Sequence, residues 1–158
     1  MKKVLILGLI GLFSGCSSGK QTIHATYVEP EATSQTDPAL EPAKAAYENQ
    51  RYRLADSLFT DLLKTDESNW QAHYYLGLIC LRTEQYLPSE NHLFQALDLV
   101  DRSNSNRALV YFALGRLYEY QQKEAQAKIN YLTAYRLDPN SVPIRQTAQK
   151  YQLISGTN

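Results

Sequence analysis

The stretch YFALGRLY, Tyr111 to Tyr118, places a Leu-Gly pair three residues after one tyrosine, and a second tyrosine three residues after the glycine. Ala127 and Tyr131 follow, and Pro139 comes 21 residues after Tyr118. An aromatic residue, Leu-Gly, Tyr, Ala, a second aromatic and a closing proline at these intervals are typical of one unit of a two-helix repeat. The small residues lie where the two helices cross and let them approach closely.

The same intervals recur through the chain with a period of 34 residues. Gly77 and Gly115 are 38 residues apart, which adds four residues to the period around Asp101 to Asn106. Four residues make about one helical turn, so we expect the second helix of the middle unit to be one turn longer than the others. Three further registers agree on spacings of 34 and 38: Ala55, Ser89, Ala127; Phe59, Leu93, Tyr131; Leu62, Ala96, Ala134.

Over residues 36–141 the chain therefore resembles a tetratricopeptide repeat (TPR) array. Three copies of differing quality carry the resemblance. The third is the best, with Tyr111, Leu114, Gly115, Tyr118, Ala127, Tyr131, Ala134 and Pro139. The second has His73, Leu76, Gly77, Cys80, Ser89, Leu93 and Ala96, with Asp101 at the proline place. The first keeps Ala55, Phe59 and Leu62 but has Ala43 for the glycine and Glu67 for the proline.

The resemblance implies an all-α fold, an α-solenoid of about three TPR helix-turn-helix repeats over residues 41–155. The repeats are expected at about 36–69, 70–107 and 108–141, with a capping helix over 142–154. Ser68-Asn69-Trp70-Gln71 fits a capping box that begins a helix, and Pro88 fits the first turn of another. Each repeat leaves an apolar face that only its neighbour covers, so about three repeats are needed for a stable core.

The first residues, MKKVLILGLIGLFSGC, predict an export signal over 1–15. Two lysines precede an apolar run that is too short for a hydrocarbon core of about 30 Å. The ending Phe13-Ser14-Gly15-Cys16 resembles a bacterial lipobox, with Phe13 where leucine is usual. The resemblance implies that Cys16 is acylated, and Ser17 in place of Asp implies the outer membrane. The alternative is a plain secretory signal with an accidental cysteine. Residues 16–40, polar and with two prolines, predict a flexible linker.

The remaining chemistry of the sequence points to no enzyme. Lys plus Arg equals Asp plus Glu at 16 each, so nothing favours a nucleic-acid partner. His73 and His92 lie on helices that can approach each other, but no Cys, Asp or Glu joins them at metal-ligand spacing, so we expect no metal and no cofactor. Cys80 is expected to be a buried, inert thiol. No phosphate-binding glycine loop or nucleophile motif occurs.

In TPR proteins the first helix of each repeat lines a concave groove. Its exposed places, carried onto this chain, predict a protein-binding strip of tyrosine, phenylalanine, leucine and arginine. The predicted groove residues are Tyr47, Gln71, Tyr74, Leu78, Arg82, Leu109, Phe112, Arg116, Glu119 and Tyr120. Alternatively, Leu78, Leu81 and Phe112 pack on the neighbouring repeat.

Together these features predict a periplasmic TPR adaptor, lipid-anchored on the inner side of the outer membrane, that binds a protein or peptide partner. The layout resembles accessory lipoproteins of pilus and secretion machines, notably tight-adherence (Flp) pilus assembly proteins and pilotins. One alternative is a regulator that docks peptidoglycan enzymes near the cell wall. Another is a soluble secretion chaperone, against which the export signal argues.

Overall fold

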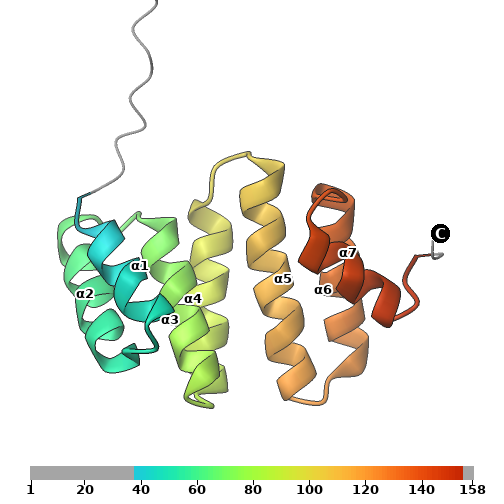
Figure 1. The fold of residues 1–158 in the computed structure, drawn as a ribbon, viewed down its shortest axis with the longest axis horizontal. Coiled ribbons are helices and arrows are strands. Elements are labelled where there is room, and N and C mark those ends of the chain that lie inside the picture. The colour runs from blue at the N-terminus through green and yellow to red at the C-terminus, as the bar shows by residue number, and fades with distance from the viewer. Residues whose placement is uncertain (1–37, 155–158) are drawn as a thin grey trace, which may run out of the picture. The chain divides into compact units, whose positions relative to one another are not determined.

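Seven helices and no strand make up residues 38–154, the part of the chain that the computed structural model describes. The predicted signal peptide, Cys16 and the linker up to residue 37 lie outside these residues. Along the chain the helices follow one another in a row (Figure 1). They are α1 Leu40–Glu48, α2 Tyr52–Thr65, α3 Trp70–Arg82, α4 Tyr86–Leu99, α5 Asn104–Tyr120, α6 Glu124–Leu137 and α7 Val142–Lys150.

The helices pair as the repeat pattern predicts. α1 packs on α2, α3 on α4 and α5 on α6, and each pair also contacts the next helix along the chain. In addition α1 contacts α3 and α3 contacts α5, so the first helices of the three pairs adjoin one another. We call α1, α3 and α5 the inner helices and α2, α4 and α6 the outer helices.

Glycine permits the close crossings within the second and third pairs. A Cβ atom added to Gly77 would lie 2.8 Å from Leu93, and one added to Gly115 would lie 2.5 Å from the ring of Tyr131. Neither distance is sterically possible without displacing a fully buried side chain. In the second pair the buried hydroxyl of Ser89 also donates a hydrogen bond to the carbonyl of Gly77, at 2.8 Å. The predicted registers of the second and third repeats are therefore confirmed.

The four extra residues lengthen an inner helix rather than the predicted outer one. α4 has 14 residues, as do α2 and α6, whereas α5 has 17 residues against 13 in α3. Ser103 is the N-cap of α5, and its hydroxyl accepts a hydrogen bond from the backbone N–H of Asn106. Because this cap starts the helix one turn early, the boundary predicted at residues 107 and 108 falls inside α5.

Two other local predictions need correction. The N-cap of α3 is Asn69, whose side chain accepts from the backbone N–H of Ala72, and not Ser68. Ser68 instead donates to the carboxylate of Asp66. Leu40, assigned to the linker, starts α1 and is 2% exposed, because it packs in the first core cluster with Ala43 and Phe59.

All three inner helices end in the same way as α7. Gln50, Glu84 and Gln122 adopt left-handed backbone angles after α1, α3 and α5, and Gln152 does so after α7. The next N–H in each case bonds back to the helix, a Schellman arrangement. α7 therefore occupies the place of a fourth inner helix. It ends at Lys150, four residues before the predicted end of the cap, because this turn closes it.

In α1, α3 and α5, the residue at which the inner helix crosses its outer helix lies seven residues before the left-handed position. These residues are Ala43, Gly77 and Gly115, and Arg145 has the corresponding place in α7. Arg145 is half-buried, whereas the other three are buried. A long side chain at this place leaves no room for an outer helix to pack as closely as in the three pairs.

Candidate functional site

The inner helices form one face because they contact each other across the repeats. Most of the predicted groove residues lie at this inner face with some exposure. Arg82, Leu109 and Tyr120 are exposed, and Tyr47, Gln71, Tyr74, Arg116 and Glu119 are partly buried. Within residues 38–154 a first aromatic region gathers at α1 and α3, and a second, polar region lies on α5.

Tyrosines dominate the region between α1 and α3. Tyr47 packs its ring against Tyr75 at 5.3 Å between centroids, and Tyr74 contacts the other side of Tyr75 at 5.3 Å. Trp70 lies 6.3 Å from Tyr74. Burial raises the pKa of Tyr74 above its usual value. Tyr75, stacked on Phe59 at 4.9 Å, was not predicted as a groove residue, because in the repeat it occupies a packing place.

The region on α5 surrounds an open pocket of about 310 Å³ lined by Arg116, Glu119 and Tyr120. Tyr120 is 51% exposed, and Leu109 at the other end of the helix is 41% exposed. The side chain of Tyr47, followed by those of Tyr52 and Tyr120, raises the pKa of Arg82 at the end of α3. Tyr47, Arg82 and Tyr120 lie near the C-terminal ends of the three inner helices.

Leu78 is not available to a partner. It is 7% exposed and packs in a core cluster with Leu114 and Leu117 of α5, as does Leu81, which is 3% exposed. The contact between neighbouring inner helices buries both leucines. Phe112 is half-buried and lies 5.5 Å from the ring of Tyr131. Leu78 and Leu81 therefore pack on the neighbouring repeat, whereas the ring contact of Phe112 is with α6 of its own repeat.

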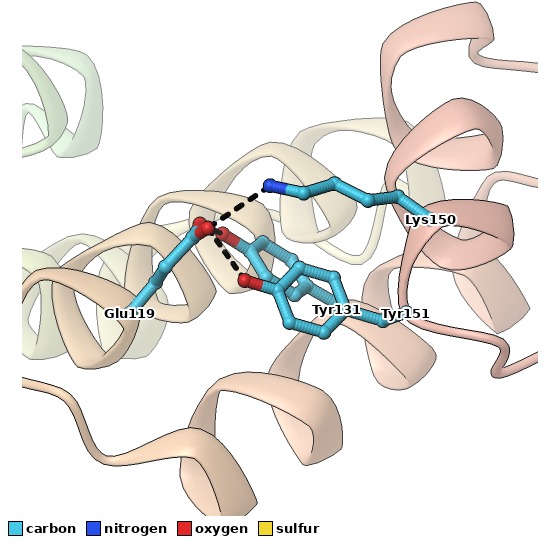
Figure 2. A network of polar contacts seen from close by, with 4 residues as sticks. All are labelled: Glu119, Tyr131, Lys150 and Tyr151. Atoms are coloured by element: carbon cyan, nitrogen blue, oxygen red, sulfur yellow. Dashed lines mark hydrogen bonds and ion pairs between the residues drawn. The ribbon is translucent and has the colours of Figure 1, made fainter.

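Glu119 holds the capping helix in place. Its carboxylate points from α5 toward two phenols and one ammonium group (Figure 2). It accepts hydrogen bonds from Tyr131 of α6 and from Tyr151 at the end of α7, both at 2.5 Å. Lys150 adds an ion pair at 3.2 Å. One carboxylate thus ties α5, α6 and α7 together.

The electrostatics of this network follow from its bonds. Burial alone would raise the pKa of Glu119, but the hydrogen bonds from Tyr131, Tyr151 and Lys150 together lower it below its usual value. Burial and the bond to Glu119 raise the pKa of Tyr151 to about 12 and also raise that of Tyr131. Glu119 is therefore a charged acceptor that already has three donors, which leaves it less capacity for a ligand.

The two histidines meet as the sequence allows. The Nδ1 atoms of His73 and His92 lie 3.2 Å apart across α3 and α4. Burial lowers both pKa values, and the neighbouring ring lowers that of His92 further. This contact is a hydrogen bond when one ring donates its Nδ1–H and the other accepts with an unprotonated Nδ1. Within residues 38–154, no three side chains of the metal-binding types converge on one point.

Cys80 is buried beside a hollow between α2 and α3. Burial raises the pKa of its thiol, and the negative charge of Asp56 raises it further. A thiol that holds its proton is a poor nucleophile.

No protein-family model matches the sequence, and no curated protein matches it. Among solved structures the chain is similar to the first TPR of Spaghetti (RPAP3) bound to the HSP90 peptide SRMEEVD. The match has a TM-score of 0.63 and 20% sequence identity, and it covers 73% of this chain and 88% of that one. The fold is TPR-like. The seven helices, their pairing and the two glycine crossings fit an all-α solenoid of this type.

Proposed function

We propose that this protein is an adaptor that binds a protein partner on its inner face and carries out no catalytic step. The observation that carries the proposal is the contact of α1 with α3 and of α3 with α5, which joins three helices into one surface. That surface includes Tyr47, Arg82 and Tyr120, which lie near the C-terminal ends of the three helices. Aromatic residues and arginine are the types enriched where proteins bind one another.

The solved neighbour gives this proposal independent support. Its TPR is bound to a peptide, so the same helical arrangement accommodates a short peptide in that protein. A three-repeat surface is short, and it suits one segment better than a large globular face.

We further propose that the adaptor is attached to the periplasmic face of the outer membrane and serves pilus or secretion-machine assembly. The support is the lipobox-like ending at Cys16 together with Ser17 after it. Acyl chains contribute about 0.8 kcal/mol per buried CH₂, and two or more chains make the attachment stable. Within residues 38–154, none of the helices is both long and apolar enough to cross a bilayer.

In-cell photo-crosslinking tests the adaptor role. A photoreactive phenylalanine analogue would replace Tyr120 or Arg82 on the inner face and, as a matched control, Ile129, which is 65% exposed on the outer helix α6. We expect one discrete adduct from the two inner sites and none from Ile129. Equal adducts from all three sites, or none, would contradict a partner on the inner face.

Fractionation of cells tests the anchor. Cys16→Ala should release the protein from the outer-membrane fraction and abolish incorporation of labelled palmitate, whereas Cys80→Ala should leave both unchanged. If Cys16→Ala stays in the membrane fraction and the parent incorporates no palmitate, the lipid anchor is wrong and the adaptor role is tested separately by the cross-links.

A further inference from the structure

The contact between His73 and His92 is a feature of the second helix pair that the repeat does not require. At the two corresponding places the first repeat has Ala39 and Leu58, and the third has Tyr111 and Asn130. Helices therefore pair in those repeats without an imidazole at either place. Of the three repeats, all within residues 38–154, only the second brings two imidazole rings together, across α3 and α4.

The two facing nitrogens have the separation of two ligands on one metal ion. The Nδ1 atoms of His73 and His92 lie 3.2 Å apart. At metal–nitrogen bonds of about 2.0–2.1 Å, this separation subtends an angle of about 103° at the metal, close to the tetrahedral angle of about 109° that is usual for zinc. The helices α3 and α4 thus hold both ligand atoms at the distance that a tetrahedral site needs.

Metal binding requires a rotation of the two side chains. Their ring centroids are 5.5 Å apart, and this distance falls to about 5.0 Å when both Nδ1 lone pairs converge on one ion at that angle. The χ2 torsion of histidine is broad, and both rings are partly exposed, so the rotation is open to them. The same exposure gives the ion and its water ligands access to the two nitrogens.

The chemistry of the two rings decides which ions fit. Neutral imidazole is the form that binds a metal, and burial favours this form in both rings by lowering their pKa values. With an ion bound, each ring carries its proton on Nε2, so that both Nδ1 lone pairs face the metal. Imidazole suits zinc, copper and nickel, whereas magnesium and calcium take oxygen ligands.

We propose that His73 and His92 bind one divalent transition-metal ion of the zinc type through their Nδ1 atoms, with water at the remaining positions. Among residues 38–154, no Cys, Asp or Glu joins the two rings as a third ligand. The expectation of no metal from the sequence rests on this missing ligand, and two facing imidazoles make a weaker, exchangeable site. The ion links α3 to α4 and stabilises the second repeat, independently of the adaptor role of the inner face.

Calorimetric titration with Zn²⁺ tests the proposal on the whole untagged chain in its Cys16→Ser form. We expect one ion bound per chain, no binding of Mg²⁺, and at least tenfold weaker binding of Zn²⁺ in His73→Tyr and in His92→Leu. These variants carry the residues that the third and first repeats have at the same places, so the fold should persist. His24→Gln and Cys80→Ala, which remove the other histidine and the buried thiol, are the matched controls and should bind like the parent.

Two further measurements separate metal binding from a packing role of the two rings. Excess Zn²⁺ should raise the melting temperature of the parent and EDTA should reverse the rise, whereas the melting temperatures of His73→Tyr and His92→Leu should stay unchanged. In nitrogen NMR spectra of the parent, Zn²⁺ should shift the Nδ1 signals of two of the three histidine rings. The NMR measurement needs no variant.

Two outcomes would overturn the metal site. Binding of Zn²⁺ that survives both His73→Tyr and His92→Leu would place the ion elsewhere on the chain. Nδ1 signals of the parent that do not respond to Zn²⁺ would show that the two rings only pack on each other, even if the variants fail to fold. Neither outcome changes the adaptor proposal, which the photo-crosslinks from the inner face test separately.

Discussion

α1 and α7 are both nine-residue helices at the ends of the row, but they are held by different forces. α1 is fixed by buried Leu40, Ala43 and Ala46 and by the ring contacts of Tyr47. α7 buries only Ile144 and Ala148 and adds the polar network around Glu119. Acid should therefore leave the attachment of α1 nearly unchanged, whereas protonation of Glu119 should weaken that of α7.

The largest effect is expected from Phe59→Ala in the first pair. Phe59 is fully buried and stacks on Tyr75, so its removal leaves a cavity and should cost about 3–5 kcal/mol. Urea unfolding at neutral and acidic pH measures it, with Phe59→Leu as the milder control. A loss that changes strongly with pH would contradict an apolar attachment of this end.

The second-largest effect, a loss of about 3 kcal/mol in the free energy of unfolding, is expected from Gly115→Leu. A side chain at this place collides with the ring of Tyr131, and overpacking of a tight core costs about 1–3 kcal/mol or slightly more. Thermal unfolding measures the loss. Arg145→Leu, at the same repeat position in α7, should leave the melting temperature nearly unchanged. Equal effects of the two substitutions would refute the assignment of α7 as an inner helix on which no outer helix packs among residues 38–154.

Glu119→Gln should destabilise the α7 end by about 1–2 kcal/mol. Hydrogen bonds to a charged group contribute about 1.5–3 kcal/mol, and partial exposure of Glu119 reduces this. Amide hydrogen exchange locates the loss, which we expect in α7 and not in α1. Glu41→Gln, which removes an exposed ion pair in α1, is the matched control. Protection lost equally at both ends would mean that Glu119 acts on the whole array.

The pH dependence of stability should sharpen the comparison further. The pKa of Tyr151 rises from 10.0 to about 12 on folding, so its contribution is complete below pH 10 and is lost as the pH rises toward 12. The pKa of Glu119 is lowered from 4.5, so its contribution is present above that value and is lost as the pH falls through the folded pKa. Melting temperatures from pH 3 to 12 measure both.

Two variants show which side chain causes the loss of stability at each end of the pH range. Tyr151→Phe should reduce the alkaline loss of stability and keep most of the acid one, because Glu119 retains Tyr131 and Lys150. Glu119→Gln should reduce both. An alkaline slope that is unchanged in Tyr151→Phe would place the titrating group elsewhere.

The smallest expected effect is a gain in stability. Gln122 follows α5 with a φ of 59°, a conformation that costs a residue with a side chain about 1 kcal/mol more than glycine. Gln122→Gly should therefore stabilise the protein by up to about 1 kcal/mol, and Gln50→Gly after α1 by the same amount, because both ends share this turn. Chemical unfolding compares them. A loss of stability in either variant would show that its glutamine side chain makes a contact that matters more than the turn.

The repeat period predicted most of this fold because it records where helices cross. Gly77 and Gly115 can be read directly, since only a residue without a Cβ atom fits the contacts with Leu93 and Tyr131. The sequence does not show which helix is one turn longer, because the same four residues can extend either α4 or α5. The cap at Ser103, a local hydrogen bond, decides it.

The candidate site was predicted less well than the fold. Repeat position alone assigned Leu78 and Glu119 to the groove, but side-chain exposure depends on what the neighbouring helix presents. Leu78 meets Leu114 and Leu117, and Glu119 meets Tyr151 from a helix 32 residues later. No short spacing in the sequence signals that long-range contact.

Arg145 has a consequence for the growth of the array. Repeat proteins lengthen when a duplicated unit stacks onto the last one, which requires a small residue at the final crossing. An arginine there blocks that addition, so we expect genetic or engineered duplications to succeed only when inserted before α7. The residue at position 145 thus decides how closely a further helix could pack on α7.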